Sequence, residues 1–303
     1  MNYDVIIIGA GAGGISAACW CAELGLKALL LESQPELGGQ LLWTHNPIKN
    51  HLGVETENGR EMRDIFVRQS ANYNFSLRTG AEVSDADLEN KIVTLQNGET
   101  FSARALIIAA GIRRRKLAAA GEEELKNKGI LESGKRDAEK VKEKNVCVVG
   151  GGDAALENAL ILAAARARKV TLVHRGKDFR ARAEFLEKVR QNPSIEILTE
   201  TMVTKIVGQE KVEAVEVENN NKVFILPVEA VLIRIGVEPN TKLFRGKLKL
   251  DKNGYIEIDN CCETSVDKVF AVGDAANPLA PTISSAVGTG AIAAKVIRDK
   301  LSD

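Results

Sequence analysis

Two stretches of the chain show the same order of apolar strand, glycine-rich turn, small-residue helix and second apolar strand. In the first stretch, the apolar run at 4–8 predicts a buried strand. The Ala-rich segment 13–24 predicts a helix that ends at Gly25, and residues 27–31 predict the next strand. This order of elements predicts a parallel βαβ unit.

The second stretch repeats the pattern in the middle of the chain. Residues 145–149 predict a strand, 154–166 a helix, and 169–173 the strand that follows. Short strands separated by polar turns are expected after each unit, over 75–112 and 195–235. Further strands are expected over 246–272, and a last helix over 283–299.

Changes in this pattern indicate where the chain passes between domains. The apolar strand at 106–109 is followed by residues 113–144, which are rich in Arg, Lys, Glu and Gly. The strand at 230–235 ends at a glycine, and the chain is expected to return to the first domain soon afterwards. The sequence predicts an α/β protein with two Rossmann-like, three-layer ββα domains, one inserted into the other. The predicted domains are 1–112 with 245–303, and 113–244.

Each βαβ pattern carries a dinucleotide-binding fingerprint at its turn. The glycines of such a turn let the backbone approach a pyrophosphate, and the N-terminus of the following helix offers free N–H groups to it. Two copies in one chain predict two dinucleotides, as electron transfer between a nicotinamide and a flavin requires. The fingerprint positions are Gly9, Gly11 and Gly14 in the first unit and Gly150, Gly152 and Ala155 in the second.

The residue that ends the second strand of each unit distinguishes the two sites. Glu32 stands there in the first unit, and a carboxylate at this place binds a ribose 2′-hydroxyl and repels a 2′-phosphate. The first site is therefore expected to hold FAD or NAD. In the second unit His174, Arg175 and, a little later, Arg180 follow the strand. Arginines can bind a 2′-phosphate through charge-assisted hydrogen bonds, which favours NADPH over the alternative, NADH.

Composition narrows the classes of function. The chain has 303 residues, and Lys plus Arg and Asp plus Glu both total 41, so the net charge gives no support for nucleic-acid binding. No apolar run is long enough for a membrane span, and no signal peptide is visible. A cytoplasmic location is expected by default. The three histidines and five cysteines have no zinc-binding spacing, and no metal site is predicted.

The cysteines form no C-x-x-C pair, and structural roles are expected for all five. Cys19 and Cys21 lie two apart in a predicted helix and point in different directions. Neighbouring Cys261 and Cys262 could join only through a strained disulfide.

In these motifs, and over nearly its whole length, the chain resembles the low-molecular-weight thioredoxin reductases of the pyridine nucleotide–disulfide oxidoreductases. The resemblance implies a homodimer, hydride transfer from NADPH to FAD, and rotation of one domain against the other. It also implies further FAD-site residues, the last two at the start of the final helix: Gly39, Gln40, Asn50, Ala110, Gly111, Gly273, Asp274, Thr282 and Ile283. For the NADPH site it adds Asp153, Glu157, Ile235 and Gly236.

The chain departs from that family where its redox-active thiols are expected. Counting back from the second glycine turn, Ser133-Gly134-Lys135-Arg136-Asp137 takes the place of C-x-x-C-Asp. A dithiol relay needs two thiols, so thioredoxin reduction by the family's usual route is not expected. Asp137 remains as a weak catalytic candidate. Gly176 also replaces an arginine of the family's 2′-phosphate signature, and Pro281-Thr282 replaces Arg-Gln beside the flavin.

These observations favour an FAD-dependent NAD(P)H oxidoreductase that passes electrons from the flavin directly to an acceptor. Ferredoxin–NADP reductases of the thioredoxin-reductase-like type share this scaffold, which makes an acidic redox protein, ferredoxin or flavodoxin, a candidate acceptor. A quinone, a small disulfide and oxygen are further candidates. The alternatives are a disulfide reductase with atypical thiols and a non-catalytic flavin-binding sensor. The basic run 113–116 is interpreted either as a solvated crossing segment or as a docking patch, for an acidic partner or for the dinucleotide phosphates.

Overall fold

The protein is described here by a computed structural model that covers residues 2–302, and the chain divides into two compact units. Unit 1 comprises Met1–Arg113 and Glu238–Asp303, and unit 2 comprises Arg114–Val237. The second boundary lies before residue 238, whereas the sequence predicted it after 244. Residues 238–244 belong to unit 1 because Asn240 donates to the Ala110 carbonyl over 2.8 Å and Phe244 is buried in the unit 1 core.

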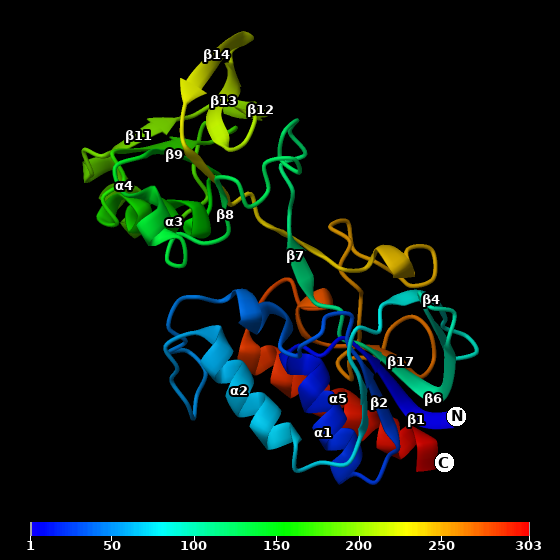
Figure 1. The fold of residues 1–303 in the computed structure, drawn as a ribbon. Coiled ribbons are helices and arrows are strands. Elements are labelled where there is room, and N and C mark those ends of the chain that lie inside the picture. Colours follow the sequence, from blue (N-terminus) through cyan, green and yellow to red (C-terminus); the bar gives the residue numbers. More distant parts are fainter. Residues whose placement is uncertain (1, 303) are drawn as a thin grey trace. The chain divides into compact units, whose positions relative to one another are not determined.

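Unit 1 is built on a seven-stranded sheet in the order β3-β2-β1-β6-β5-β4, with β17 paired to the second half of β6 (Figure 1). The strands β1, β2, β3, β6 and β17 run parallel, while β4 and β5 form an antiparallel continuation of β6. The bounds are β1 Asn2–Ile8, β2 Ala28–Leu31, β3 Ser76–Arg78, β4 Val83–Asp87, β5 Ile92–Leu95, β6 Thr100–Ile108 and β17 Val269–Ala271.

The two faces of this sheet are covered differently. Helices α1 (Ala12–Glu23), α2 (Gly59–Ser70) and α5 (Ile283–Ser302) lie on one face, where Val5 and Ile7 of β1 enter the core. Ile6 and Ile8 point to the other face and pack against β4, β5 and the segment around Phe244. The alternation follows from the strand period of two, and burial of both faces explains why β1 is apolar from Val5 to Ile8.

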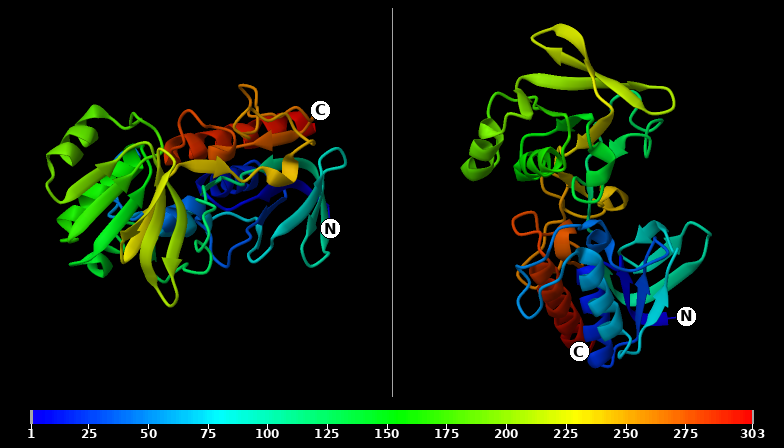
Figure 2. Two further views of the ribbon diagram at one scale, coloured as in Figure 1. Left: turned by 90° about the horizontal axis from the view of Figure 1, so that it is seen from above. Right: turned by 60° about the vertical axis from the view of Figure 1, so that its left-hand side comes forward.

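Unit 2 contains a five-stranded parallel sheet in the order β11-β10-β9-β15-β8. Helices α3 and α4 cover one face of this sheet, and the antiparallel sheet β12-β13-β14 covers the other (Figure 2). The bounds are β8 Ile130–Leu131, β9 Asn145–Val149, α3 Asp153–Ala164, β10 Lys169–Val173, α4 Ala183–Gln191, β11 Ile195–Leu198, β12 Thr201–Gly208, β13 Val212–Asn219, β14 Lys222–Pro227 and β15 Ala230–Ile233.

Both units therefore have the Rossmann-like arrangement that the sequence predicted, and the α/β fold is confirmed. The two segments that connect the units, β7 (Ile112–Arg114) and β16 (Val237–Pro239), pair as a two-stranded sheet. Four short 3-10 helices complete the elements of the described residues: η1 Gly39–Trp43, η2 Ala138–Val141, η3 Lys242–Phe244 and η4 Gly273–Ala275.

Three segments differ from the sequence prediction. Helices α2 and α4 were not predicted, although Asn58 caps α2 by accepting from the Glu61 N–H over 3.0 Å. Over 246–272 only β17 is a strand, beside isolated bridges. Asp251 and Asp259 explain this, because their side chains accept backbone N–H groups that a sheet ladder would use.

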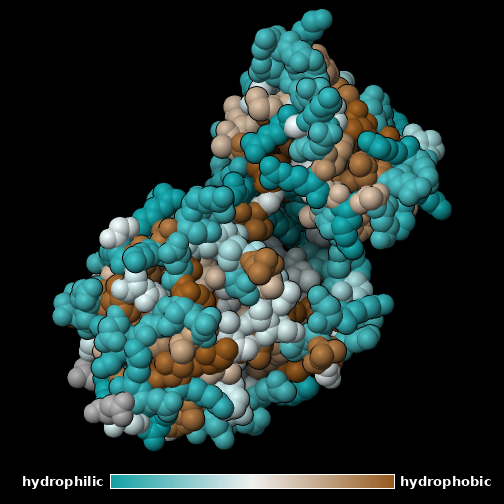
Figure 3. All heavy atoms as spheres, turned by 180° about the vertical axis from the view of Figure 1, so that it is seen from behind, coloured by the Kyte–Doolittle hydropathy of each residue, from teal (hydrophilic) through white to brown (hydrophobic). Residues whose placement is uncertain are grey.

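The visible surface is mainly hydrophilic, and hydrophobic side chains gather in separate groups on the face that Figure 3 shows. Within residues 2–302, none of the helices combines the length and the hydropathy that crossing a bilayer requires.

Candidate functional site

The glycine turn of unit 1 connects β1 to α1 and depends on three glycines for different reasons. Gly9 has φ +104°, and a Cβ there would overlap the Ala109 carbonyl. A Cβ at Gly14 would overlap the Gly9 carbonyl, so Gly14 lets the helix pack directly on the strand. At Gly11 a Cβ would meet nothing within 4 Å. The turn therefore leaves open space beside Gly11, where a phosphate could approach the backbone.

This open space belongs to a cavity of about 730 Å³ within unit 1. Of the predicted flavin-site residues, those that line it are Gly9, Gly11, Glu32, Gly39, Gln40, Ala110, Gly111, Gly273, Asp274, Thr282 and Ile283. Gly14 does not line it, because it acts at the helix–strand contact. Asn50 does not line it either and is exposed. The structure thus gathers segments far apart in sequence around one cavity but leaves Asn50 outside it.

Glu32 is almost completely buried at the end of β2, where it both lines the cavity and supports the glycine turn. Its Oε2 accepts from the Ala10 N–H over 2.8 Å, and its Oε1 accepts from the Gln34 N–H over 2.9 Å. The carboxylate has further acceptor capacity for a ribose hydroxyl, since two oxygens offer about four lone-pair sites. Its contact with Ala10 also fixes the backbone beside the proposed phosphate position.

The loop that follows Gly38 closes against the same turn. The Gly38 N–H donates to the Ala10 carbonyl over 2.8 Å, and Gly39 has φ +53°. A Cβ at Gly39 would lie only 3.1 Å from the Gly11 Cα, so a side chain would be crowded there. Gln40 donates through its Nε2 to the Ile112 carbonyl over 2.8 Å. These contacts hold the loop as part of the cavity wall.

Asp274 and the start of α5 form another part of the cavity wall. Partial burial raises the pKa of the Asp274 carboxyl. Among residues 2–302 no side chain or backbone group donates to this carboxylate, so its oxygens are available to hydroxyl donors in the cavity. Thr282 caps α5 by accepting from the Ser285 N–H over 3.1 Å, and the positive end of the helix therefore lies at the cavity.

These features fit FAD. The cavity is lined by a glycine turn that a phosphate can approach, by the buried Glu32 carboxylate, which suits a ribose, and by the free Asp274 carboxylate, which suits a polyol. The N-terminus of α5 also lies at the cavity, where it would favour negative charge on a flavin ring. Each group is supplied by the end of a strand or the start of a helix, so the cavity is shaped by regular structure.

The glycine turn of unit 2 follows β9 and leads into α3. Gly150 has φ +148°, and a Cβ at Gly152 would meet nothing within 4 Å, as at Gly11. At Gly151 a Cβ would overlap the imidazole of His174. Ala155, at the third fingerprint position, is fully buried. The turn is thus open at Gly152, the second glycine of the fingerprint, and covered by His174 at Gly151.

His174 and the loop after it are held by local contacts. The ring stacks on Phe179 with centroids 4.9 Å apart, and its Nε2 lies 3.0 Å from the Asp178 carbonyl. Asp153, at the start of α3, accepts from the backbone N–H of Arg182 over 2.7 Å and from its Nε over 2.8 Å. The backbone hydrogen bond is the main cause that lowers the pKa of Asp153. Asp153 therefore anchors this loop, a partnership with Arg182 that the sequence did not predict.

The guanidinium groups of Arg175 and Arg180 are exposed and have no hydrogen-bond or ion-pair partner within residues 2–302. The backbone N–H of Arg180 donates to the Gly151 carbonyl over 2.9 Å, which brings it to the glycine turn. Two unpaired cations at the end of β10 suit a phosphate group. Of the other predicted residues, Glu157 lies in α3, Ile235 packs on the core, and Gly236 has φ +96° beside β16.

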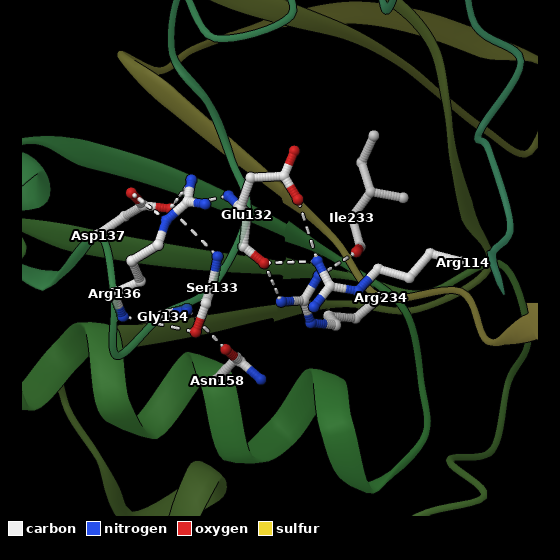
Figure 4. Close-up of polar contacts among 9 residues, drawn as sticks. All are labelled: Arg114, Glu132, Ser133, Gly134, Arg136, Asp137, Asn158, Ile233 and Arg234. Carbon is white, nitrogen blue, oxygen red and sulfur yellow. Dashed lines mark hydrogen bonds and ion pairs between the residues drawn. The ribbon is translucent and has the colours of Figure 1, made fainter. Parts of the chain in front are cut away.

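Residues 133–137, where the sequence analysis expected the C-x-x-C position, form a closed, hydrogen-bonded loop (Figure 4). Asp137 is completely buried, and its Oδ2 accepts from the backbone N–H groups of Glu132 over 2.8 Å and Ser133 over 3.1 Å. Burial opposes its ionisation, but hydrogen bonds from Lys140 and from these N–H groups lower the pKa of Asp137 to about 2. Asp137 therefore anchors this loop, and its ionised carboxylate is enclosed by the groups that it binds.

None of the cysteines lines the unit 1 cavity, and all five are free thiols. Burial raises the pKa of Cys21 and Cys147 to about 12 and that of Cys19 and Cys262 to about 11. Only Cys261 is exposed. The four thiols whose pKa is raised are poor nucleophiles at neutral pH because the thiolate is the reactive form.

Comparisons with known proteins agree with this geometry. Residues 3–290 match the family described as pyridine nucleotide-disulphide oxidoreductase. A thioredoxin reductase of Mycolicibacterium smegmatis is 36% identical over 296 residues, covering 96% of this chain and 94% of its own. A 34.2 kDa protein in the rubredoxin operon of Clostridium pasteurianum is 31% identical over 297 residues, covering 97% and 95%.

Solved structures give the same result. Lactococcus lactis thioredoxin reductase in its FR conformation superposes with a TM-score of 0.86 at 29% identity, covering 99% of both chains. T. acidophilum thioredoxin reductase gives a TM-score of 0.84 at 28% identity, covering 100% of this chain and 99% of its own. The chain belongs to the pyridine nucleotide-disulphide oxidoreductase family and is a thioredoxin reductase-like, FAD-dependent NAD(P)H oxidoreductase whose cofactors are FAD and NADPH.

Proposed function

We propose that this protein takes hydride from NADPH onto FAD and passes the electrons from the flavin to an acceptor without a thiol pair of its own. The observation that carries the proposal is the loop of residues 133–137. It offers a hydroxyl and a guanidinium where a dithiol relay needs two sulfurs.

In this proposal unit 1 holds FAD and unit 2 holds NADPH. Bound FAD supplies the ability to accept hydride and release electrons singly or in pairs. Glu32 and the Gly11 backbone would bind the adenosine ribose and the pyrophosphate, and Asp274 would accept from the ribityl hydroxyls. The N-terminus of α5 at Thr282 would stabilise negative charge near the ring. In unit 2, Arg175 and Arg180 would bind the 2′-phosphate beside the open turn at Gly152.

The acceptor is proposed to be a small redox protein, which the name of the Clostridium pasteurianum relative supports. The basic run does not add support for docking. Arg113 pairs with Glu238 over 2.7 Å, Arg114 pairs with Glu132 over 3.3 Å, and Lys116 pairs with Glu123. Arg115 donates to the Val237 carbonyl. Because the run is already engaged within the protein, its solvated-segment interpretation is favoured over a free docking patch.

A cysteine-free variant tests the proposal. Replacement of all five cysteines with alanine should leave flavin reduction by NADPH, and reoxidation by the acceptor, at the rates of the unchanged protein. Anaerobic stopped-flow absorbance follows the first step. The second step is followed with rubredoxin, ferredoxin, flavodoxin, a quinone, a small disulfide and oxygen in turn. Loss of acceptor reduction with intact flavin reduction would instead support a disulfide reductase with atypical thiols. A flavin that never bleaches with NADPH would support a non-catalytic flavin-binding protein.

A further inference from the structure

The carboxyl edge of the unit 2 sheet carries a pair of arginines that the proposed function does not use. Strand order in this sheet is β11-β10-β9-β15-β8, so the direction of winding reverses between β9 and β15. The glycine turn follows β9, Arg234 follows β15, and Glu132 follows β8. Dinucleotides bind across such a reversal, outside the carboxyl ends of the strands.

Arg114 and Arg234 converge on Glu132, although they come from different segments of the chain (Figure 4). Each donates to the Glu132 carbonyl over 2.6 Å, and Arg114 also pairs with the Glu132 carboxylate over 3.3 Å. Arg234 donates in addition to the Ile233 carbonyl over 2.8 Å. The side chains of Arg114 and Glu132 are 37% and 28% exposed, so water screens their charges only in part.

The charges in this cluster do not cancel. Arg114 and Arg234 bring two positive charges and Glu132 one negative charge. Asp137 is buried between Arg136 and Lys140, whose cations more than balance it. Burial lowers the pKa of Arg234 to about 10, which leaves the guanidinium protonated at neutral pH. The strand ends at β15 and β8 therefore carry a net positive charge that is partly removed from water.

The position of this charge relative to a bound dinucleotide follows from the other half of the site. With the 2′-phosphate at Arg175 and the pyrophosphate at the turn near Gly152, the adenosine half occupies the β10 side of the reversal. The nicotinamide half then lies over β15 and β8, toward Arg234 and Glu132. The nicotinamide ring is a cation when oxidised and uncharged when reduced.

We propose that Arg114 and Arg234 make unit 2 discriminate between oxidised and reduced nicotinamide, by repelling the positively charged ring of NADP⁺. The uncharged ring of NADPH is not repelled, so the reduced donor binds more tightly and the oxidised product leaves after hydride transfer. The inference rests on the proposed NADPH site of unit 2 and adds specificity-determining residues to it.

Isothermal titration of the oxidised FAD-loaded protein with two ligands tests this. The ligands are NADP⁺ and 1,4,5,6-tetrahydro-NADP, whose ring is uncharged and donates no hydride. The unchanged protein should bind the tetrahydro ligand more tightly. In Arg234→Gln the dissociation constant of NADP⁺ divided by that of the tetrahydro ligand should fall by roughly tenfold, the order expected for one charge about 12 Å away at an effective dielectric constant near 20. Arg234→Lys keeps the charge and should retain most of the ratio.

Two further variants separate this charge effect from general damage to the site. Glu132→Gln removes the opposing negative charge and should raise the ratio. Arg175→Gln acts on the 2′-phosphate, which both ligands share, so it should weaken both equally and leave the ratio unchanged. Arg114→Gln, at a side chain that is 37% exposed, should also lower the ratio and serves as the test if Arg234→Gln fails to fold.

The outcomes distinguish the inference from the proposed function. If the unchanged protein binds both ligands and neither Arg234→Gln nor Arg114→Gln changes the ratio, the inference is overturned while the NADPH site stands. If the unchanged protein binds neither ligand, the proposed NADPH site fails, and the inference fails with it.

Discussion

Replacement of Asp137 tests how the loop of residues 133–137 is held. Its carboxylate is completely buried and accepts two backbone N–H groups, those of Glu132 and Ser133. A buried N–H left without an acceptor costs about 1–3 kcal/mol. The ion pairs with Arg136 and Lys140 add little, because those side chains are 36% and 67% exposed. We expect Asp137→Ala to lower the free energy of unfolding of unit 2 by about 3–5 kcal/mol. Asp137→Asn, which keeps an acceptor oxygen, should lower it by about 1–2 kcal/mol.

The pH dependence of this effect has a definite sign. The pKa of Asp137 is lowered from 3.8 to about 2 in the folded protein. A group whose folded pKa is depressed contributes stability above its unfolded pKa, and the contribution disappears as pH falls through the folded pKa. The difference in stability between the unchanged protein and Asp137→Asn should therefore be full at pH 7 and shrink between about pH 4 and pH 2.

The positions of the tryptophans allow the unfolding of unit 1 to be followed separately. Trp20 and Trp43, the two tryptophans of the chain, both lie in unit 1, so their fluorescence during urea unfolding reports on that unit. Far-UV circular dichroism reports on both units. Asp137→Ala should shift a circular dichroism transition to lower urea and leave the fluorescence transition in place. An alanine variant whose unfolding curves match those of the unchanged protein, or an equal shift in both signals, would refute this account of the loop.

Three further predictions concern the cofactor sites. Gly11→Ala places a Cβ in open space of the cavity and should abolish tight FAD binding without loss of folding. Gly9→Ala, at φ +104° and against the Ala109 carbonyl, should instead destabilise the protein. Flavin content and urea unfolding of both variants check these expectations. Asp274→Ala should weaken FAD binding about tenfold. It should leave the flavin-free protein as stable or slightly more stable, since partial burial already disfavours the ionised carboxylate. An equal loss of stability in the flavin-free and the FAD-loaded protein would contradict this prediction. Arg175→Gln should reduce the preference for NADPH over NADH about tenfold in the rate of flavin bleaching, and an unchanged preference would show that its guanidinium does not bind the 2′-phosphate.

Local patterns predicted the parts of the fold that local physics determines. The strands before both glycine turns, and the helices after them, follow from continuous apolar runs and small residues, and the structure has them within two residues of the predicted bounds. Helix α2 was missed because its apolar positions are few. The Asn58 cap and Glu61, whose carboxylate accepts from the Glu57 N–H, were the signal that could have found it.

The contacts that complete the sites could not be predicted from the sequence, because they join residues that are far apart along the chain. Glu132 and Arg234 are 102 residues apart, and only the pairing of β8 with β15 brings them together. The Asp153–Arg182 contact likewise depends on how the loop after β10 folds back on α3. Asn50 was assigned by resemblance, and the loop that carries it places it outside the cavity.

Reductive titration tests the central claim most directly. Anaerobic addition of dithionite to the FAD-loaded protein should reach complete reduction after one electron pair per flavin, because no disulfide accompanies the flavin as a second acceptor. Uptake of two electron pairs per flavin would reveal a redox-active disulfide and contradict the account.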